Sequence, residues 1–276
     1  MKRLLQKFVR GFGYDIRRLP DGRGEALYPY VAEFKKDNLY FKYWITDETY
    51  RDWYKPDQHA AWHETSATIQ LVAQGNSILE IGSNNGFTMC LLKSITGTDA
   101  LFVGMEIIPS NCQVANSQIG LNSLQNCHML HLGGSDRSES VRVFNTNNGF
   151  ITSDTIQNVI EVQTIPPDEL ISTYGYFDVL KIDVEGFEGR VLKGSRRLLE
   201  RTPKLIVELH GADVSRYGSS YKEIFDLIGI EKYEGSMCLR NDNELRRFDP
   251  ERLLRDEPHA TMFLTPRQQP TELSNH

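Results

Sequence analysis

From residue 77 onward, short apolar runs alternate with longer segments of helical pattern. Strands that alternate with helices form a parallel sheet, because the chain must cross back before the next strand can begin beside the last. The sequence therefore predicts an α/β fold, with helices on both faces of a mostly parallel sheet. The expected strands cover residues 77–82, 101–107, 127–132, 177–183 and 204–210, with late strands near 233–240 and 261–264 and a hairpin within 141–165.

The segment before this pattern has a different character. Residues 2–13 form a short basic amphipathic pattern, which predicts a helix that either packs on its own domain or contacts an anionic membrane or a membrane-bound partner. Residues 39–64 contain all three tryptophans mixed with charges, and are read as a lid or acceptor platform or as aromatics that cap a core edge. We expect an N-terminal extension at 1–59, an α/β domain at 60–266 and a C-terminal tail at 267–276.

Composition narrows the class of protein. The net charge of −6 argues against duplex nucleic acid as the main partner. The four cysteines form no C-x-x-C pair, which predicts reduced thiols in a cytosolic protein. The sequence contains no run of eighteen apolar residues, and its basic N-terminus lacks the apolar stretch of a secretory signal.

The first predicted strand ends in "LEIGSNNG". Gly82 and Gly86 allow a tight turn and close approach of a ligand to the backbone. Asn84 stands where the dinucleotide fingerprint G-x-G-x-x-G has its central glycine, which argues against a pyrophosphate. Glu106 ends the second strand and can accept hydrogen bonds from both hydroxyls of a ribose, while Glu80 can lie near a sulfonium or amino group. S-adenosylmethionine fits these features better than NAD.

Five stretches carry a family resemblance: "ILEIGSNNGF", "VGMEIIPSN", "GGSD", "FDVLKIDVEGFEGRVLKG" and "LIVELHG". Over residues 77–265 the sequence resembles the FkbM-type class I methyltransferases. The resemblance implies a Rossmann-like methyltransferase sheet of seven strands, with helices on both faces and S-adenosylmethionine as methyl donor. It also implies acceptors that are hydroxyls of glycans or secondary metabolites.

The resemblance implies roles for single residues as well. The sequence departs from the usual family start, because Glu80 replaces an Asp and Ser83 replaces an Ala, and both changes are conservative. The implied cofactor-binding residues are Glu80, Gly82, Ser83, Asn84 and Gly86 on the first loop, Glu106 on the ribose, Ser135 and Asp136 near the adenine, and Asp183 beside the methionine part and the transferred methyl.

Carboxylates and a histidine follow the two strands that come next in the expected sheet. Asp183 and Glu185 follow one strand, and Glu208 and His210 end its neighbour, so we expect the four to meet at one mouth. His210 is the candidate general base, with Asp183 and Glu208 as catalytic partners. The same four residues are candidate ligands of Mg²⁺ or Mn²⁺, and a structural role is the third alternative. Glu188 is interpreted as a first-turn helix residue favoured by the helix dipole.

These interpretations predict a cytoplasmic S-adenosylmethionine-dependent O-methyltransferase that acts on a small molecule or glycan, in polysaccharide biosynthesis for example. The basic N-terminal segment predicts peripheral contact with a membrane or a membrane-bound glycan-assembly enzyme. One alternative is a nucleotide-dependent oxidoreductase, which the missing central glycine opposes. The other is a non-catalytic scaffold of a glycan-assembly complex, which the acidic cluster opposes.

Overall fold

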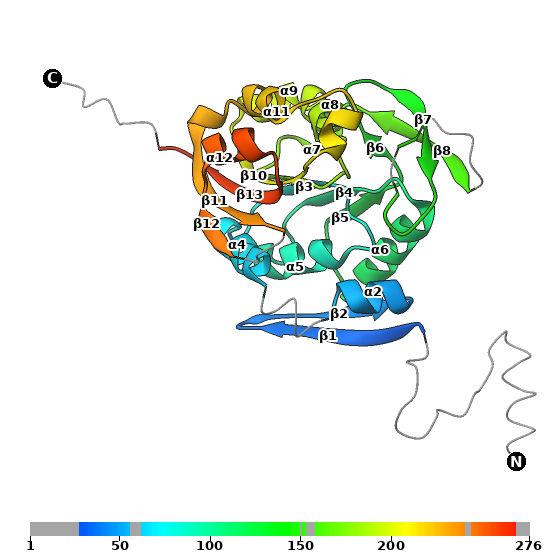
Figure 1. Cartoon of the computed structure of the whole chain (residues 1–276). Helices are drawn as coiled ribbons and strands as arrows, with labels where there is room; N and C mark the ends of the chain where they lie inside the picture. The colour runs from blue at the N-terminus through cyan, green and yellow to red at the C-terminus, as the bar shows by residue number, and fades with distance from the viewer. Residues whose placement is uncertain (1–27, 56–61, 150, 153–157, 241–243, 269–276) are drawn as a thin grey trace, which may run out of the picture.

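The computed structural model describes residues 28–55, 62–149, 151–152, 158–240 and 244–268. Its centre is an eight-stranded sheet with the order β12-β11-β13-β10-β9-β3-β4-β5 (Figure 1). The predicted mostly parallel α/β sheet is confirmed. The parallel strands are β3 (Ile78–Ile81), β4 (Phe102–Met105), β5 (Cys127–Leu130), β9 (Val179–Ile182) and β10 (Lys204–His210).

The order of the sheet reverses between β3 and β9. From β3 the chain moves through β4 to β5 at one edge, and later returns to place β9 and then β10 on the other side of β3. At such a reversal the loops after the two central strands lead away from each other, which leaves a crevice beyond their carboxyl ends. The loops after β3 and β9 are therefore where a ligand site is expected.

The other edge of the sheet is antiparallel and contains one strand more than the sequence predicted. β13 (His259–Pro266) pairs antiparallel with β10, and β11 (Tyr233–Leu239) pairs antiparallel with β13. The predicted number of seven strands is corrected to eight by β12 (Leu245–Arg247), which pairs with β11 at the edge. Three residues of sequence "LRR" are too short and too polar to be detected by hydrophobic pattern.

Successive strand residues point to opposite faces of the sheet, so each strand contributes to two cores. In β3, Ile78 packs in the layer with α5 and the N-terminal strands, while Leu79 packs in the opposite layer with α8 and α11. Figure 1 shows these two helical layers. The first contains α4 (His63–Leu71), α5 (Phe87–Thr96) and α6 (Pro109–Leu121), and the second contains η1 (Pro167–Leu170), α7 (Ile171–Tyr174), α8 (Glu188–Lys193), α9 (Arg196–Glu200), α10 (Asp213–Arg216), α11 (Tyr221–Ile228), η2 (Ile230–Lys232) and α12 (Pro250–Asp256).

A small second sheet confirms the predicted hairpin. β7 (Glu139–Phe144) pairs antiparallel with β8 (Val159–Ile165), and β6 (Gly133–Gly134) adds to β8 in parallel. After β7 the chain returns toward the main sheet, where Gly149 contacts Ile108 so closely that a Cβ would lie 2.1 Å from its Cδ1. The hairpin thereby places one loop beside the ligand crevice.

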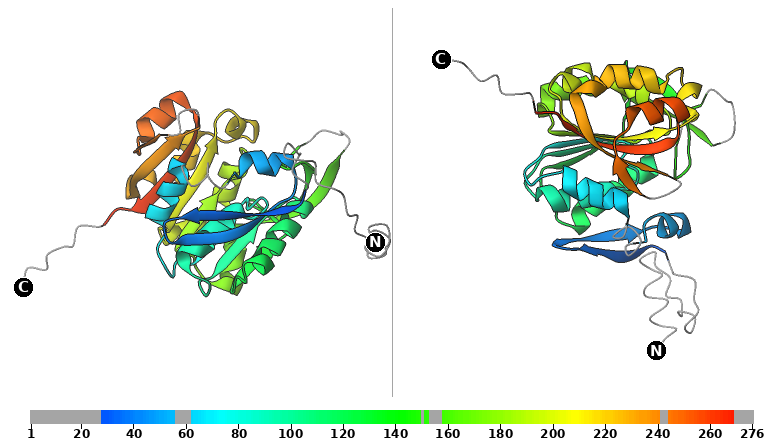
Figure 2. Two further views of the ribbon diagram at one scale, coloured as in Figure 1. Left: turned by 90° about the horizontal axis from the view of Figure 1, so that it is seen from below. Right: turned by 60° about the vertical axis from the view of Figure 1, so that its left-hand side comes forward.

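The described part of the N-terminal extension is mostly a β-hairpin, which the sequence analysis did not predict. β1 (Tyr30–Lys36) and β2 (Leu39–Ile45) pair antiparallel, and the only helix described before residue 62 is α2 (Glu48–Trp53). The alternation of buried and exposed residues in these strands is the period of a half-buried strand. Figure 2 shows the hairpin on the outer side of the α5–α6 layer, where Phe34 and Phe41 pack edge-on against Phe87. The predicted basic helix at 2–13 lies outside the described residues.

Candidate active site

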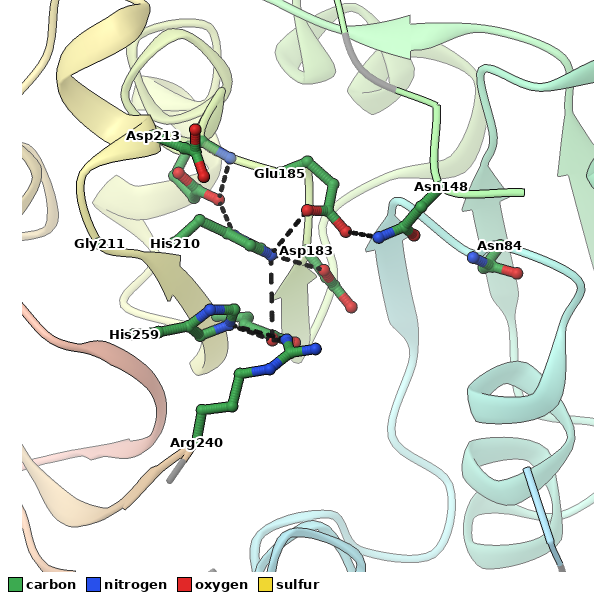
Figure 3. Close-up of polar contacts among 12 residues, drawn as sticks. Asn84, Asn148, Asp183, Glu185, His210, Gly211, Asp213, Arg240 and His259 are labelled. Carbon is green, nitrogen blue, oxygen red and sulfur yellow. Dashed lines mark hydrogen bonds and ion pairs between the residues drawn. The ribbon is translucent and has the colours of Figure 1, made fainter. Parts of the chain in front are cut away.

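A cavity of about 540 Å³ opens beyond the carboxyl ends of β3, β4, β9 and β10. We distinguish two ends of it by the strands beside them. Asp183, after β9, lies between the two ends, which Figure 3 views together. The β4 end is lined by Gly82, Asn84, Glu106, Gly133 and Gly134, and the β13 end is lined by Trp62, Glu64, Glu208, Arg240 and His259.

In the turn after β3 the backbone lies very close to the backbone of the segment after β9. Gly82 has φ +87°, and a Cβ there would lie 1.7 Å from the carbonyl oxygen of Asp183, so the turn requires glycine. Asn84 lines the cavity with Gly82 and also has a positive φ of 49°. Gly86 is the N-cap of α5 at φ +85°, and the side chain of Ser83 is buried, so these two predicted cofactor residues shape the loop but do not line the cavity.

Glu106 is buried and is held in place by two backbone donors. Its Oε2 accepts a hydrogen bond from the Asn84 N–H at 2.7 Å, and its Oε1 accepts one from the Ile108 N–H at 2.7 Å. Burial raises the pKa of Glu106 to about 7, although the two backbone donors lower it. A carboxylate offers about four lone-pair sites, so each oxygen can accept a further hydrogen bond from a group in the cavity. The geometry fits two adjacent hydroxyls of a ribose.

The segment after β5, which includes β6, lines the cavity with its backbone. Gly133 and Gly134 lie on the wall. The two side chains that the sequence indicated there, those of Ser135 and Asp136, do not line it. Asp136 forms an ion pair with Arg190 at 2.5 Å, which turns its carboxylate toward α8. Ser135 and Asp136 thus lie next to this wall rather than on it, and their place near an adenine stays a prediction.

The loop after β7 contributes residues that the sequence did not single out. The carbonyl oxygen of Asn147 accepts hydrogen bonds from Asn84 at 3.3 Å and from Asn111 at 3.0 Å. Asn148 donates a hydrogen bond to Glu185, so the loop spans from the turn after β3 to the turn after β9 (Figure 3). The only sequence signal for this wall was the run of asparagines in a predicted polar loop.

Glu80 lies beneath the cavity wall rather than on it. Its side chain is fully buried, and its Oε1 is 3.3 Å from Nζ of Lys181. Lys181 lines the cavity and is also 3.4 Å from Oδ2 of Asp183. Burial raises the pKa of Asp183, and the charge of Glu208 raises it further, while Lys181 lowers it. The lysine thus compensates part of the negative charge at the centre of the cavity.

His210 lies at the meeting point of four carboxylates (Figure 3). Its Nδ1 is 2.6 Å from Oε1 of Glu188. Its Nε2 points toward the cavity and lies 3.5 Å from Glu185, 3.7 Å from Asp183 and 3.9 Å from Glu208. The structure therefore brings together the four residues that were predicted to meet, Asp183, Glu185, Glu208 and His210. Glu188 also belongs to this cluster, and the sequence interpretation missed it.

Glu188 begins α8, as interpreted, but its carboxylate points inward and is fully buried. Besides His210, its Oε1 accepts a hydrogen bond from the Gly186 N–H at 3.0 Å. Gly186 has φ +99° and Glu185 has φ +52°, so the turn after β9 is left-handed at two successive residues. Glu188 thus holds both the turn and the histidine in place.

These contacts change the protonation of His210. Burial lowers the pKa of His210, but the hydrogen bond with Glu188 and the charges of Asp183 and Glu208 outweigh it and raise the pKa to about 10. The surrounding carboxylates thus favour the imidazolium form of His210, and the ring is not among the residues that line the cavity. The raised pKa of His210 disfavours a histidine base tuned near neutral pH, because the surrounding carboxylates favour a proton on the ring.

A second histidine lies on the cavity wall itself. Nε2 of His259 is 2.6 Å from Oε1 of Glu208, and Arg240 approaches the same oxygen at 3.5 Å. Burial raises the pKa of Glu208, but the hydrogen bond with His259 and the charge of His210 lower it to about 2. His259 was not selected from the sequence, because its position opposite β10 follows only from the antiparallel pairing of β13.

Two overlapping sets of side chains in this cluster have the composition of a divalent-cation site. Ligand atoms of Asp183, Glu185 and His210 lie within 4.8 Å of one another, as do those of Glu208, His210 and His259. Carboxylate oxygens suit Mg²⁺ and Mn²⁺, and a histidine must be neutral to coordinate a metal. The raised pKa of His210 therefore disfavours both sets as metal sites, because the ring must lose its proton before it can bind a cation.

The order of the sheet, the glycine turn after β3 and the acid after β4 together define a Rossmann-like fold of the class I methyltransferase type. The methyltransferase FkbM domain matches residues 80–236 of the sequence, which is more than half of the chain. The chain therefore belongs to the FkbM family of S-adenosylmethionine-dependent methyltransferases.

Solved structures of similar fold include other methyltransferases. The methyltransferase FkbM from Methylobacillus flagellatus KT has 18% identity and a TM-score of 0.46, over 69% of this chain and 43% of that chain. The chain thus spans less than half the length of that protein. Aeropyrum pernix fibrillarin, in complex with natively bound S-adenosyl-L-methionine, has 14% identity and a TM-score of 0.44, over 73% of this chain and 74% of that chain. No curated protein matches the sequence.

Proposed function

We propose that this FkbM-family protein is an O-methyltransferase that acts on a hydroxyl group of a sugar, a glycan or a secondary metabolite. The observation that supports this proposal is one cavity with two unlike ends. The β4 end offers backbone groups and one anchored acid, and the β13 end offers aromatic and carboxylate side chains. Aromatic faces together with carboxylates are suited to a polyhydroxylated ring, which has both apolar faces and hydroxyl donors.

The β4 end fits S-adenosylmethionine. The two oxygens of Glu106 can accept from the ribose hydroxyls, and the backbone at Gly133 and Gly134 leaves space for a flat base. Asp183, at the centre of the cavity, faces the methionine part of the cofactor. The positive charge there compensates the negative charge of the Asp183 carboxylate. When bound, this cofactor supplies an electrophilic methyl group on a positively charged sulfur.

The chain itself must bind the acceptor, exclude water and take up the proton of the acceptor hydroxyl. We assign the proton to Asp183, because its carboxylate lines the cavity and because burial and the charge of Glu208 raise its pKa. His210 lies behind this carboxylate and holds it in position. A general base of this kind contributes about 10²–10⁴-fold to a rate. The alternative, Mg²⁺ or Mn²⁺ on the same carboxylates, would lower the pKa of the acceptor hydroxyl instead.

Peripheral contact of the basic segment 2–13 with a membrane-bound glycan-assembly enzyme in the cytoplasm remains a proposal. None of the helices in the described residues combines the length and the hydropathy of a membrane span. Removing residues 1–13 should abolish sedimentation with anionic vesicles if the segment is a membrane contact. The melting temperature of the shortened protein reports whether the segment packs on the domain instead.

The experiment that tests the proposed function begins with calorimetry of the full chain with S-adenosylmethionine, S-adenosylhomocysteine and NAD. Transfer of a radiolabelled methyl group to a panel of saccharides then identifies the acceptor, with and without a chelator. Binding of NAD alone would favour an oxidoreductase. Binding of S-adenosylmethionine without transfer to any acceptor would favour a scaffold, and loss of transfer with chelator would favour the metal mechanism.

A further inference from the structure

Glu64 is a carboxylate at the β13 end of the cavity that the mechanism above does not use. It lies in the first turn of α4 and lines the cavity. Its Oε1 accepts a hydrogen bond from Oγ1 of Thr261 at 2.9 Å. Within the described residues, no lysine, arginine or histidine forms an ion pair with Glu64, although four cationic or histidine side chains lie elsewhere in the site.

The lack of an ion pair at Glu64 is significant because of the charges around it. Six carboxylates gather on and behind the wall at the centre and the β13 end, and among the described residues the cations opposing them are Lys181, His210 and Arg240. S-adenosylmethionine adds a net charge of +1, from a sulfonium and an ammonium against one carboxylate. Even if His259 is counted as a further cation, one carboxylate stays uncompensated. The six carboxylates belong to Glu64, Glu80, Asp183, Glu185, Glu188 and Glu208.

The partners of the other five carboxylates leave Glu64 as the one without an ion pair among the described residues, although the charge of Lys181 still lowers its pKa. Each of the others lies within 4.0 Å of a cationic or histidine side chain, as the ion pairs of Lys181 and His210 describe. Burial raises the pKa of Glu64, and the charge of Glu208 raises it further, so a cation beside Glu64 would relieve an existing repulsion.

The aromatic wall of the cavity has the matching chemistry. Trp62 lies on the cavity wall at the β13 end, just before α4. Aromatic faces attract cations through their quadrupole, and carboxylates bind them directly. The same carboxylates repel phosphate or carboxylate groups, because like charges in a partly desolvated cavity are unfavourable.

We propose that the acceptor carries a protonated amine close to the hydroxyl that is methylated, as in an amino sugar, and that Glu64 binds this amine. The inference rests on the proposed function, because it assigns the acceptor class of the same cavity. Glu64 is then a specificity-determining residue, and acceptors that bear phosphate or carboxylate groups are excluded.

The test measures binding and needs no turnover. Calorimetry with S-adenosylhomocysteine comes first. The full chain, saturated with that product in the presence of EDTA, is then titrated with glucosamine, glucose and glucose 6-phosphate. We expect glucosamine to bind about tenfold more tightly than glucose, which corresponds to about 1.4 kcal/mol, and glucose 6-phosphate to bind most weakly. Equal affinities, a preference for the phosphate, or no binding of any sugar would overturn the proposal.

Variants of the same protein show whether Glu64 is responsible. Glu64→Gln should bring glucosamine to the affinity of glucose, whereas Glu64→Asp, which keeps the charge, should retain part of the preference. The matched control is Glu251→Gln, at an exposed position in α12, which should change nothing. If the amine preference survives in Glu64→Gln, the assignment is wrong. Failure of the wild type to bind S-adenosylhomocysteine would reject the proposed function itself, whereas normal binding without an amine preference rejects only this inference.

Discussion

The two ends of the cavity are built in different ways. At the β4 end the groups facing the cavity are largely backbone, and the one acid, Glu106, is fixed by two N–H donors close to it in the fold. At the β13 end the groups are mostly side chains, from α4, β10, β13 and the turn after β11. Each of these side chains depends on another for its position and its charge, as His210 and Glu208 illustrate.

This difference indicates which changes should spread through the site and which should stay local. A change at the β4 end should affect cofactor binding and little else, since backbone donors do not depend on distant charges. A change in the charge cluster should disturb several side chains at once, because buried charges stabilise one another only as a set. The following predictions test this distinction.

The largest effect is expected for Glu188→Ala. It removes the partner of His210 and the acceptor for the Gly186 N–H, and leaves the imidazolium without its closest carboxylate. Breaking a buried ion pair costs about 3–5 kcal/mol, so the free energy of unfolding in urea should fall by that amount. The control is Glu223→Ala, which removes a partly exposed ion pair with Lys193 and should cost less than about 1 kcal/mol. Equal losses in the two variants would contradict the assigned role of Glu188.

The second prediction compares two glycines of similar φ. Gly82→Ala should destabilise the protein by about 3 kcal/mol, because left-handed strain adds to a clash with the carbonyl oxygen of Asp183. Gly75→Ala has the same kind of strain at φ +81° but no atom within 4 Å of the new Cβ, so it should cost about 1–2 kcal/mol. Thermal and urea unfolding of both variants measure the difference. A Gly82 variant as stable as the Gly75 variant would mean that the loops after β3 and β9 do not touch.

The third prediction separates the two ends by affinity. Glu106→Gln replaces one acceptor oxygen by a donor, so calorimetry should find S-adenosylmethionine bound more weakly by about 1.5–3 kcal/mol. Glu208→Gln, at the β13 end, should leave that affinity nearly unchanged and weaken acceptor binding instead. Circular dichroism checks that both variants are folded. If both variants lose cofactor affinity equally, the cavity does not have two separate ends.

The smallest effect concerns pH, and its sign follows from the raised pKa of Glu106 of about 7. The ligand-free fold binds the proton of Glu106 more tightly than the unfolded chain does, so this group stabilises the fold at low pH. Its contribution should decline as the pH rises from about 4.5 to 7. Ribose hydroxyls donate to the carboxylate form, so S-adenosylmethionine affinity should change in the opposite direction and fall about tenfold from pH 8 to pH 6. Glu106→Gln should abolish both trends, and a flat affinity profile in the wild type would contradict the assignment.

Two features could be predicted from the sequence, for a common physical reason. One is the alternation of strands and helices, and the other is the set of residues at the β4 end of the cavity. A buried strand must be apolar, a tight turn needs glycine, and an acid at a strand end occupies a known place relative to the neighbouring turn. Gly82 and Glu106 could therefore be selected by position alone. The edge strand β12 and the hairpin of β1 and β2 were not, because three polar residues or an aromatic-rich segment have no decisive period.

The tertiary structure alone decided the chemistry of the charge cluster. The sequence indicated that Asp183, Glu185, Glu208 and His210 would meet, but not that Glu188 would bind the ring of His210 from behind. It also contained no sign that His259 and Glu64, from β13 and α4, would reach the same wall. A pKa depends on every charge within a few ångströms, and those charges come from segments far apart in the chain. Local sequence therefore determined which groups were available, while packing determined that the pKa of His210 is raised and that Glu64 forms no ion pair among the described residues.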